Sequence, residues 1–157
     1  MNNLEYTSLF QLIKDNNIHK NEIIKQYMLL LLQLTNAPVV SIEVFTIKLL
    51  EITNIGYINV CYFKTEENRI HVIGSGTIIF EPKIIRNGQY VGHIEDIIVD
   101  EKYRSMGIAK IIINKLINLA NEKKCYKIIL DCKYNLSDFY EKLGFEKKGI
   151  QMAKYFE

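Results

Sequence analysis

The stretch HIEDIIVDEKYRSMGIAK, from His93 to Lys110, decides how this chain folds and what it can bind. It begins as an apolar strand that ends at Val99, and after Gly107 it continues as an amphipathic helix. The first turn of a helix has about four backbone N–H groups without partners and roughly half a positive charge, so it attracts a phosphate. Gly107 would let a bulky anion approach the backbone closely, and Arg104 and Lys110 add positive charge. The break between strand and helix is therefore predicted to hold a phosphate group.

The break matches neither of two widespread nucleotide-binding motifs. A P-loop has Gly-Lys-Ser/Thr after its glycines and a Rossmann fingerprint spaces several glycines, whereas residues 99–110 contain a single glycine. On spacing alone, the favoured interpretation is a strand-to-helix turn with a solvated basic edge. The neighbouring segments have to decide between the two interpretations.

Two helices are predicted upstream of this stretch. Residues 23–34 carry apolar side chains on nearly all sides, as a helix packed on several faces would, and residues 35–38 end it. Ser41 has the side chain of an N-cap, with an apolar pattern over residues 44–50 behind it. A second helix is therefore predicted to follow Ser41.

The middle of the chain is predicted to form strands. Residues 56–63, 70–80 and 90–99 are rich in Ile, Val, Tyr and Thr, and turn residues separate them at 65–68 and 86–88. Short turns between consecutive strands predict an antiparallel meander.

The pattern changes again after Gly107. Apolar residues such as Ile108, Ile111 and Ile112 line one face of a helix that is polar on the other. YKIILDC, residues 126–132, is a short continuous apolar strand of the sort that is buried on both faces in parallel pairing. A short helix ending near Leu143 and a last strand over residues 145–156 are predicted to follow.

This order of elements predicts an α/β (α+β) fold, with a mixed, mostly antiparallel central sheet and helices on both faces. We find no internal repeat and no linker rich in proline or glycine among the 157 residues. The chain is therefore expected to form a single domain over residues 1–157.

Composition and charge exclude several classes of protein. The chain is 48% hydrophobic and 24% charged, and its formal net charge of +2 is too small to indicate a nucleic-acid binder. No basic segment followed by a long apolar one opens the sequence, and the most apolar run, residues 27–34, is far shorter than the roughly 20 residues that span a bilayer. Cys61, Cys125 and Cys132 lack the spacing of a zinc site or a disulfide framework. The expectations are a cytoplasmic protein without membrane association and without a metal site.

Two motifs in the right order carry a resemblance to a known family. RSMGIA, residues 104–109, resembles the Arg/Gln-x-x-Gly-x-Gly/Ala loop of the GNAT acetyltransferase superfamily, which wraps the pyrophosphate of acetyl-CoA. DFYEKLGF, residues 138–145, is similar to the closing segment of that superfamily. Within it, GHIEDIIV and YKIILDC closely resemble the glucosamine 6-phosphate N-acetyltransferases, and QLT, residues 33–35, with EPKIIRNG extends the similarity upstream.

The resemblance implies a GNAT fold, a homodimer, and direct transfer of the acetyl group of acetyl-CoA to the amine of glucosamine 6-phosphate, on the route to UDP-N-acetylglucosamine. It implies that Glu95, Asp96 and Tyr140 are the catalytic residues. The residues that it implies for acetyl-CoA are Ile97, Ile98, Val99, Arg104, Ser105, Met106, Gly107, Ile108, Ala109, Lys110, Asn135 and Tyr140. Those that it implies for the sugar phosphate are Thr35, Lys83, Ile85, Arg86, Glu95, Asp96, Asp131, Lys154 and Tyr155.

Among the departures of this sequence from the pattern of the family, two affect the expected contacts with substrate and cofactor. An arginine near the C-terminus often reaches the sugar phosphate, frequently across the dimer, and this chain has Lys154 and Tyr155 there. A lysine offers a point charge in place of a bidentate fork. The asparagine expected before the tyrosine is Leu136, with Asn135 one place early.

The chemistry of the two carboxylates sets a structural condition. Adjacent residues in a strand point to opposite faces, so Glu95 and Asp96 can share one pocket only if the strand has a bulge. A carboxylate with an ordinary pKa near 4 is a weak base, so we expect a water relay or a backbone carbonyl to remove the proton while the carboxylates orient the ammonium. The alternative interpretation is a polar strand edge without a catalytic role.

Tyr140 also has two interpretations. A phenol has a pKa of about 10 and a thiol of about 8.5, so the Tyr140 hydroxyl can donate a hydrogen bond or a proton to a departing sulfur. Alternatively, Tyr140 only packs beside Phe139 and Phe145. A covalent acetyl-enzyme on Cys132 is disfavoured, because no histidine in the sequence is placed to activate the thiol.

Two other functions stay open at the level of sequence. One is a GNAT enzyme for another amine, such as a polyamine or a protein amine, although Lys83, Arg86 and Lys154 favour an anionic substrate. The other is an acyl-CoA-binding module without turnover. Product formation across a panel of amines would distinguish the three.

Overall fold

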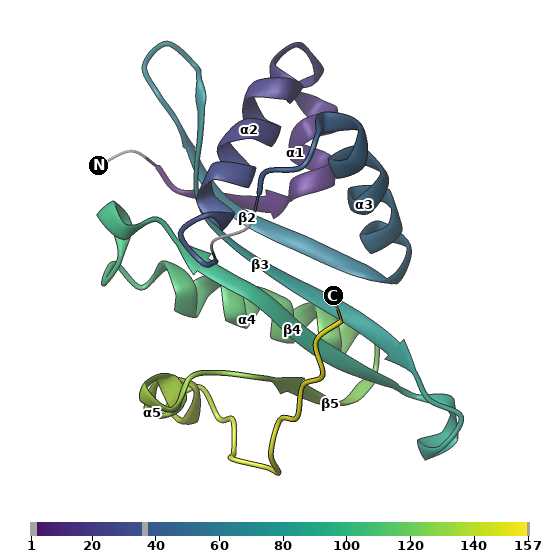
Figure 1. The fold of residues 1–157 in the computed structure, drawn as a ribbon. Helices are drawn as coiled ribbons and strands as arrows, with labels where there is room; N and C mark the ends of the chain where they lie inside the picture. The colour runs from purple at the N-terminus through teal and green to yellow at the C-terminus, as the bar shows by residue number, and fades with distance from the viewer. Residues whose placement is uncertain (1–2, 36–37, 157) are drawn as a thin grey trace.

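The computed structural model describes residues 3–35 and 38–156, and within them five strands form one mixed sheet (Figure 1). Its order is β1 (Glu5–Ser8), β2 (Gly56–Lys64), β3 (Ile70–Pro82), β4 (Tyr90–Val99), β5 (Cys125–Leu130). The first three neighbouring pairs are antiparallel, and β4 and β5 are parallel. The predicted mixed, mostly antiparallel sheet is confirmed.

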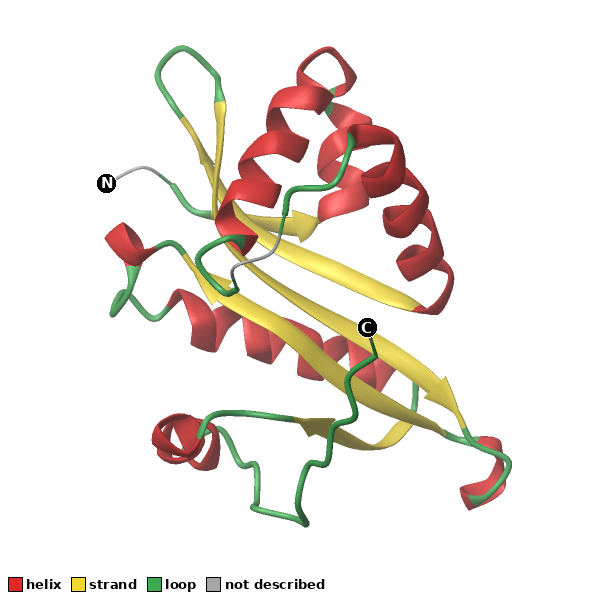
Figure 2. Ribbon diagram, in the orientation of Figure 1, coloured by secondary structure: helices red, strands yellow, loops and turns green. Residues whose placement is uncertain are grey.

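Helices cover both faces of this sheet (Figure 2). On one face lie α1 (Leu9–Asp15), α2 (Lys20–Leu31) and α3 (Ile42–Ile55), and on the other lies α4 (Ile108–Glu122). The last helix is the short α5 (Ser137–Glu141). Single 3₁₀ turns stand at Asn17–His19, Arg86–Gly88, Glu101–Tyr103 and Tyr134–Leu136.

Each face of the sheet has its own hydrophobic core. Under α1, α2 and α3 lie buried side chains that include Leu9, Ile23 and Val60. Under α4 the core includes Ile78 and Ile112, both without any exposed surface. The predicted apolar face of α4 is correct except at Ile111, which is 40% exposed, while Ile113 is fully buried.

The predicted helices and meander strands lie where the sequence indicated, within a few residues. The Ser41 hydroxyl accepts a hydrogen bond from the Val44 N–H (3.3 Å), so the predicted N-cap of α3 is confirmed. α2 ends at Leu31, and its chain tightens into a turn in which the Gln33 N–H donates to the Leu30 carbonyl (3.1 Å). The sequence reading missed β1 and α1, although the Ser8 hydroxyl caps α1 by accepting from the Gln11 N–H.

Two predictions about the C-terminal part are wrong. In the described chain no strand follows β5, and residues 146–156 run as an exposed segment without sheet pairing. β5 is also not buried on both faces, because α1, α2 and α3 stand over the β1–β3 side of the sheet and leave β5 uncovered (Figure 1). Its side chains therefore alternate, with Ile128 packed towards the α4 core and Ile129 39% exposed.

Candidate active site

A β-bulge in the middle of β4 brings Glu95 and Asp96 to the same face of the sheet. Thr77 pairs with Glu95 and Ser75 pairs with Ile98, so β4 has one residue more than β3 in this interval. Ile94 and Ile97 both belong to the core on the α4 side, so the two residues between them project from the opposite face. Asp96 has a φ of 52°, in the left-handed region, as a bulge of this kind requires. The structural condition set by the sequence is met.

β4 and β5 separate at the same place. Their pairing ends where Ile94 meets Leu130, whereas β4 continues to Val99. Beyond Ile94, the edge of β4 that faced β5 is open. Ile98 and Val99 bury their side chains in the two cores, so only their backbone N–H and C=O groups are available at this edge. Within residues 3–35 and 38–156 no other strand pairs with that edge. The separation leaves room for an extended ligand beside the second half of β4.

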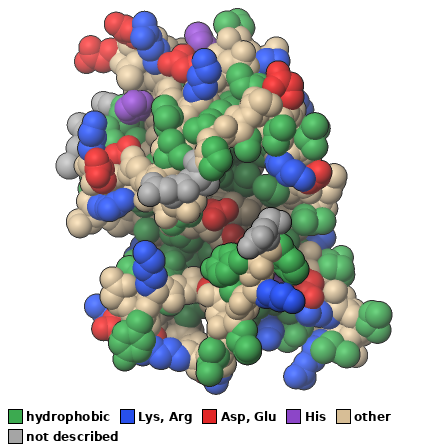
Figure 3. Space-filling view, in the orientation of Figure 1, with side chains coloured by type: hydrophobic (Ala, Val, Ile, Leu, Met, Phe, Trp, Pro, Cys, Tyr) green, Lys and Arg blue, Asp and Glu red, His purple; other side chains and the backbone are tan. Residues whose placement is uncertain are grey.

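Three carboxylates gather at this opening, and we call Glu95, Asp96 and Asp131 the carboxylate cluster. Burial raises the pKa of Glu95, and the negative charges of Asp96 and Asp131 raise it further. Burial likewise raises the pKa of Asp96. The Asp131 carboxylate accepts a hydrogen bond from Gln151 Nε2 (2.7 Å) in the C-terminal segment. Figure 3 shows acidic side chains in a hollow at the middle of this face, a setting that favours a cationic group such as an ammonium.

The segment from Arg104 to Lys110, which we call the anion cradle, joins the end of β4 to α4. Ser105 and Gly107 have φ values of 64° and 78°, and no side chain caps the first N–H groups of α4. Nothing lies within 4 Å of the position that a Cβ on Gly107 would occupy, so the positive φ, and not lack of space, requires glycine there. Arg104 Nε donates to the Val99 carbonyl (3.1 Å), which anchors that arginine beside the end of β4. The donor set of the anion cradle therefore fits a pyrophosphate.

Tyr140 lies in α5 and is 8% exposed. Its ring packs edge-to-face on Phe139 (5.1 Å between centroids) and on Phe145 (5.9 Å), so the packing interpretation is correct as far as it goes. Burial raises the pKa of the Tyr140 phenol, and the nearby Cys132 raises it further, so the hydroxyl keeps its proton at neutral pH. A protonated phenol is a hydrogen-bond donor, and both interpretations are therefore compatible.

The sequence reading missed Glu81, which links Lys83 of the β3–β4 turn to His93 of β4. Glu81 binds the Lys83 ammonium with one carboxylate oxygen and His93 Nε2 with the other (2.9 Å). His93 and Glu95 are two residues apart in β4, so their side chains lie on the same face of the sheet. The contacts of Glu81 therefore lead from the turn towards Glu95. Arg86 lies over the Tyr126 ring (5.7 Å) and Ile85 is 67% exposed. No local pattern marked Glu81, because Lys83 lies beyond the end of β3 and His93 lies on the neighbouring strand.

Four other predicted residues lie at exposed positions. Thr35 follows α2, and Asn135 stands in the 3₁₀ turn before α5. Lys154 lies over the Phe156 ring (5.8 Å), and Tyr155 is 93% exposed. Across the part of the chain that the structure describes, no hydrogen bond or ion pair joins Lys154 or Tyr155 to the carboxylate cluster.

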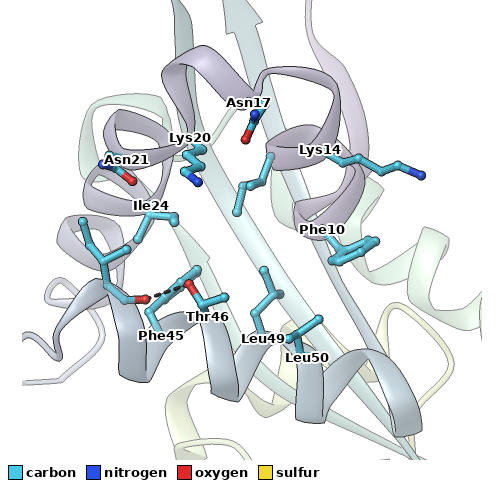
Figure 4. Close-up of a pocket in the computed structure, with 12 residues that line it drawn as sticks. Phe10, Lys14, Asn17, Lys20, Asn21, Ile24, Phe45, Thr46, Leu49 and Leu50 are labelled. Carbon is cyan, nitrogen blue, oxygen red and sulfur yellow. Dashed lines mark hydrogen bonds between the residues drawn. The ribbon is translucent and has the colours of Figure 1, made fainter.

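A pocket of about 290 Å³ lies away from this opening, between α1, α2 and α3 (Figure 4). Its lining includes Ile24, Phe45 and Leu49, with Lys14 and Lys20 at the edge. None of its twelve lining residues is a carboxylate, so it lacks the groups that would hold an amine.

Neither a metal site nor a membrane-spanning helix is present among the described residues. Residues 3–35 and 38–156 contain no group of three or more His, Cys, Asp or Glu side chains that could hold a metal ion. Over the same residues, no helix combines the length and the apolar character needed to cross a membrane.

Comparison with known proteins agrees with this geometry. Residues 38–145 match the Acetyltransferase (GNAT) family, and the chain belongs to that family. Its relatives include the glucosamine 6-phosphate N-acetyltransferase of Arabidopsis thaliana, 37% identical over 133 residues, which are 85% of this chain and 89% of the relative. A probable glucosamine 6-phosphate N-acetyltransferase 2 of Oryza sativa is 35% identical over 84% of this chain and 81% of its own. The crystal structure of the Arabidopsis enzyme superposes with a TM-score of 0.82 at 32% identity, covering 99% of both chains.

Proposed function

We propose that this protein transfers the acetyl group of acetyl-CoA to the amine of glucosamine 6-phosphate, giving N-acetylglucosamine 6-phosphate for UDP-N-acetylglucosamine synthesis. The similarity to the Arabidopsis and Oryza enzymes supports this substrate. The observation that carries the proposal is the position of the carboxylate cluster. It lies where β4 and β5 separate, and the anion cradle follows the end of the same strand, β4.

Acetyl-CoA supplies an acetyl thioester, and this chain has suitable groups for both ends of the molecule. Ile97, Ile98 and Val99 offer backbone hydrogen bonds along the open edge of β4 to the pantetheine arm. The N–H groups of the anion cradle, with Arg104 and Lys110, bind the pyrophosphate. Asn135 stands before α5, on the side of the opening where Tyr140 lies.

The carboxylate cluster orients the amine for attack on the thioester. An amine with a pKa of about 8 loses its proton at pH 7 at a cost of about 1.4 kcal/mol, so a strong base is not required. A water molecule beside Glu95 and Asp96 passes the proton to solvent, or a backbone carbonyl accepts a hydrogen bond from the amine while its proton leaves to solvent. The amine nitrogen then bonds to the acetyl carbon, the carbon–sulfur bond breaks, and the nitrogen releases its second proton to solvent. The sulfur receives a hydrogen bond from the Tyr140 hydroxyl, or a proton that Tyr140 regains from solvent. Both substrates are bound together, so much of the rate gain comes from positioning.

The sugar phosphate binds among the basic groups at the edge of the opening. Lys83 and Arg86 of the β3–β4 turn supply positive charge, with Ile85 between them and Thr35 contributed from the turn after α2. Asp131 contacts the sugar from the end of β5. Lys154 and Tyr155 reach the phosphate of a neighbouring copy of the chain.

A homodimer is part of this proposal. The C-terminal segment exposes Ile150, Met152 and Phe156 by 92%, 92% and 86%, and monomeric proteins rarely leave that much apolar surface together. The uncovered face of β5 is a second surface that a copy of the chain would bury. A cytoplasmic location is also proposed, because the three cysteines are all free thiols.

The test is turnover by the purified protein with acetyl-CoA and glucosamine 6-phosphate, beside unphosphorylated glucosamine and a lysine peptide. Mass spectrometry of the product avoids thiol dyes, which the protein's own cysteines would confuse. We expect acetylation that depends on the sugar phosphate. Turnover with the peptide or with glucosamine alone would overturn the substrate, and acetyl-CoA binding without any product would overturn the enzyme.

A further inference from the structure

The side-chain amide of Gln33 joins two loops that are distant in the sequence. Its Nε2 donates to Asp100 Oδ2 (3.2 Å), and its Oε1 accepts from the Glu101 N–H (3.0 Å). The donor and the acceptor of one amide are therefore both used, at positions 67 and 68 residues further along the chain. This pair of hydrogen bonds, which we call the Gln33 brace, links the turn after α2 to the segment that precedes the anion cradle.

Asp100 is a fixed point for the Gln33 brace because its other polar groups are already bonded. Its N–H donates to the Ile73 carbonyl of β3 (2.9 Å), and its own carbonyl accepts from the Tyr103 N–H (2.8 Å). Its Oδ1 caps the 3₁₀ turn by accepting from the Lys102 N–H (2.9 Å). Oδ2 is the oxygen that remains, and Gln33 takes it. Asp100 thus fixes the path of the chain from β4 to Arg104.

The other end of the Gln33 brace is anchored to α2. The Gln33 N–H donates to the Leu30 carbonyl (3.1 Å), and the Thr35 N–H donates to the Leu31 carbonyl (3.3 Å). Gln33 and Thr35 therefore belong to one hydrogen-bonded turn that closes α2. A single side chain therefore joins this turn to the segment that precedes the anion cradle.

We propose that Gln33 is a positioning residue, which holds the anion cradle in its binding shape and keeps it in register with the turn that carries Thr35. Gln33 acts through Asp100 and Glu101 and touches neither substrate. The inference rests on the proposed function, because it assigns acetyl-CoA to the anion cradle and the sugar phosphate to the side of Thr35.

The main variant is Gln33→Ala, which removes both hydrogen bonds. Hydrogen bonds at this strength and exposure predict a rise of about 3- to 10-fold in the KM for acetyl-CoA, with a smaller rise in the KM for the sugar phosphate and little change in kcat. The matched control is Gln11→Ala, because Gln11 also bonds an aspartate, Asp15, on an exposed surface (2.6 Å) but lies in α1. This control is expected to leave both KM values unchanged.

A polarity swap tests the two hydrogen bonds separately. Gln33→Glu keeps an acceptor for the Glu101 N–H but sets two carboxylates against each other, and Asp100→Asn sets two amide donors against each other. Each single variant is expected to raise the KM for acetyl-CoA. In the double variant the new amide at position 100 donates to the new carboxylate at position 33, which still accepts from Glu101. The double variant is therefore expected to return to within about 2-fold of the wild-type KM.

Amide hydrogen exchange gives a readout that does not depend on turnover. The Glu101 N–H is expected to exchange faster in Gln33→Ala, and acetyl-CoA is expected to slow it again. Unchanged KM values, even with a lower melting temperature, would overturn the positioning role, as would a double variant no better than the singles. A wild-type protein that acetylates no amine would overturn the proposed function instead, and Glu101 exchange would still report whether the Gln33 brace forms.

Discussion

The two halves of the sheet are built differently. β2 and β3 pair along nearly their whole length, from Gly56 opposite Ile79 to Lys64 opposite Ile70, and most of their residues are buried. β4 and β5 pair only as far as Ile94 and Leu130, and beyond that point β4 bulges and carries Glu95 and Asp96 at exposed positions. The paired half places apolar side chains in two cores, whereas the half that separates places charges where a substrate could reach them. Full pairing and exposed charge are therefore divided between the two halves of the sheet.

The largest expected effect is the loss of a core side chain under the paired half. Ile112 of α4 has no exposed surface and packs against β3, so Ile112→Ala should lower the free energy of unfolding by about 2–5 kcal/mol. Chemical denaturation measures this. Ile111→Ala is the matched control, because Ile111 is the neighbouring residue of α4 and is 40% exposed. Equal losses at the two positions would contradict the division between core and surface of α4.

The separated half should respond mainly in activity, with only a small change in stability. Glu95→Gln keeps the shape of the side chain but removes a charge from the carboxylate cluster, so the amine loses part of its orientation. We expect kcat/KM to fall on the order of 100-fold, the size of effect that small displacements of a reacting group produce. Steady-state kinetics with glucosamine 6-phosphate measures the fall, and an unchanged kcat/KM would show that Glu95 is only a polar strand edge.

A smaller effect is expected at Tyr140, which belongs to both regions. Tyr140→Phe retains the edge-to-face packing on Phe139 and Phe145 and removes the hydroxyl. A fall in kcat of about 10-fold is expected, with an unchanged melting temperature, if the phenol donates to the departing sulfur. A loss of stability without a change in kcat would instead assign Tyr140 to the core alone.

The smallest expected effect is a change in the stability of the folded protein with pH. Because the pKa of Glu95 is raised in the folded protein, the folded state binds the proton more tightly than the unfolded state does. Stability should therefore fall as the pH rises from the ordinary glutamate pKa through the raised value. The charge of Glu95 should cost some stability at pH 7 and none well below pH 4.

Glu95→Gln removes this cost, so its melting temperature at pH 7 should exceed that of the wild type by about 1–2 °C, a small gain because the side chain is partly exposed. The difference should vanish at pH 3. Glu66→Gln, in the exposed turn between β2 and β3, serves as the control without a gain. A lower melting temperature for Glu95→Gln at pH 7 would contradict the division between stability and function.

Much of the fold could be predicted from local patterns in the sequence. The N-cap at Ser41, the three meander strands and the apolar face of α4 all depend on residues close together in the chain, so propensity and period suffice to locate them. The motif at residues 104–109 was equally readable, because a strand, a turn and a helix follow one another without a long loop. Glu81 and the Gln33 brace were not readable, since they join residues that only the folded sheet brings together.

The sequence by itself determined the class of fold and the family, because these follow from short-range periodicity and from motifs of contiguous residues. Only the tertiary structure decided that β4 has a bulge at Asp96, that β5 leaves β4 at Leu130, and that residues 146–156 form no strand within one chain. The physical reason is that pairing register and sheet coverage depend on what stands opposite each strand, and alternation along one segment carries no information about its partner.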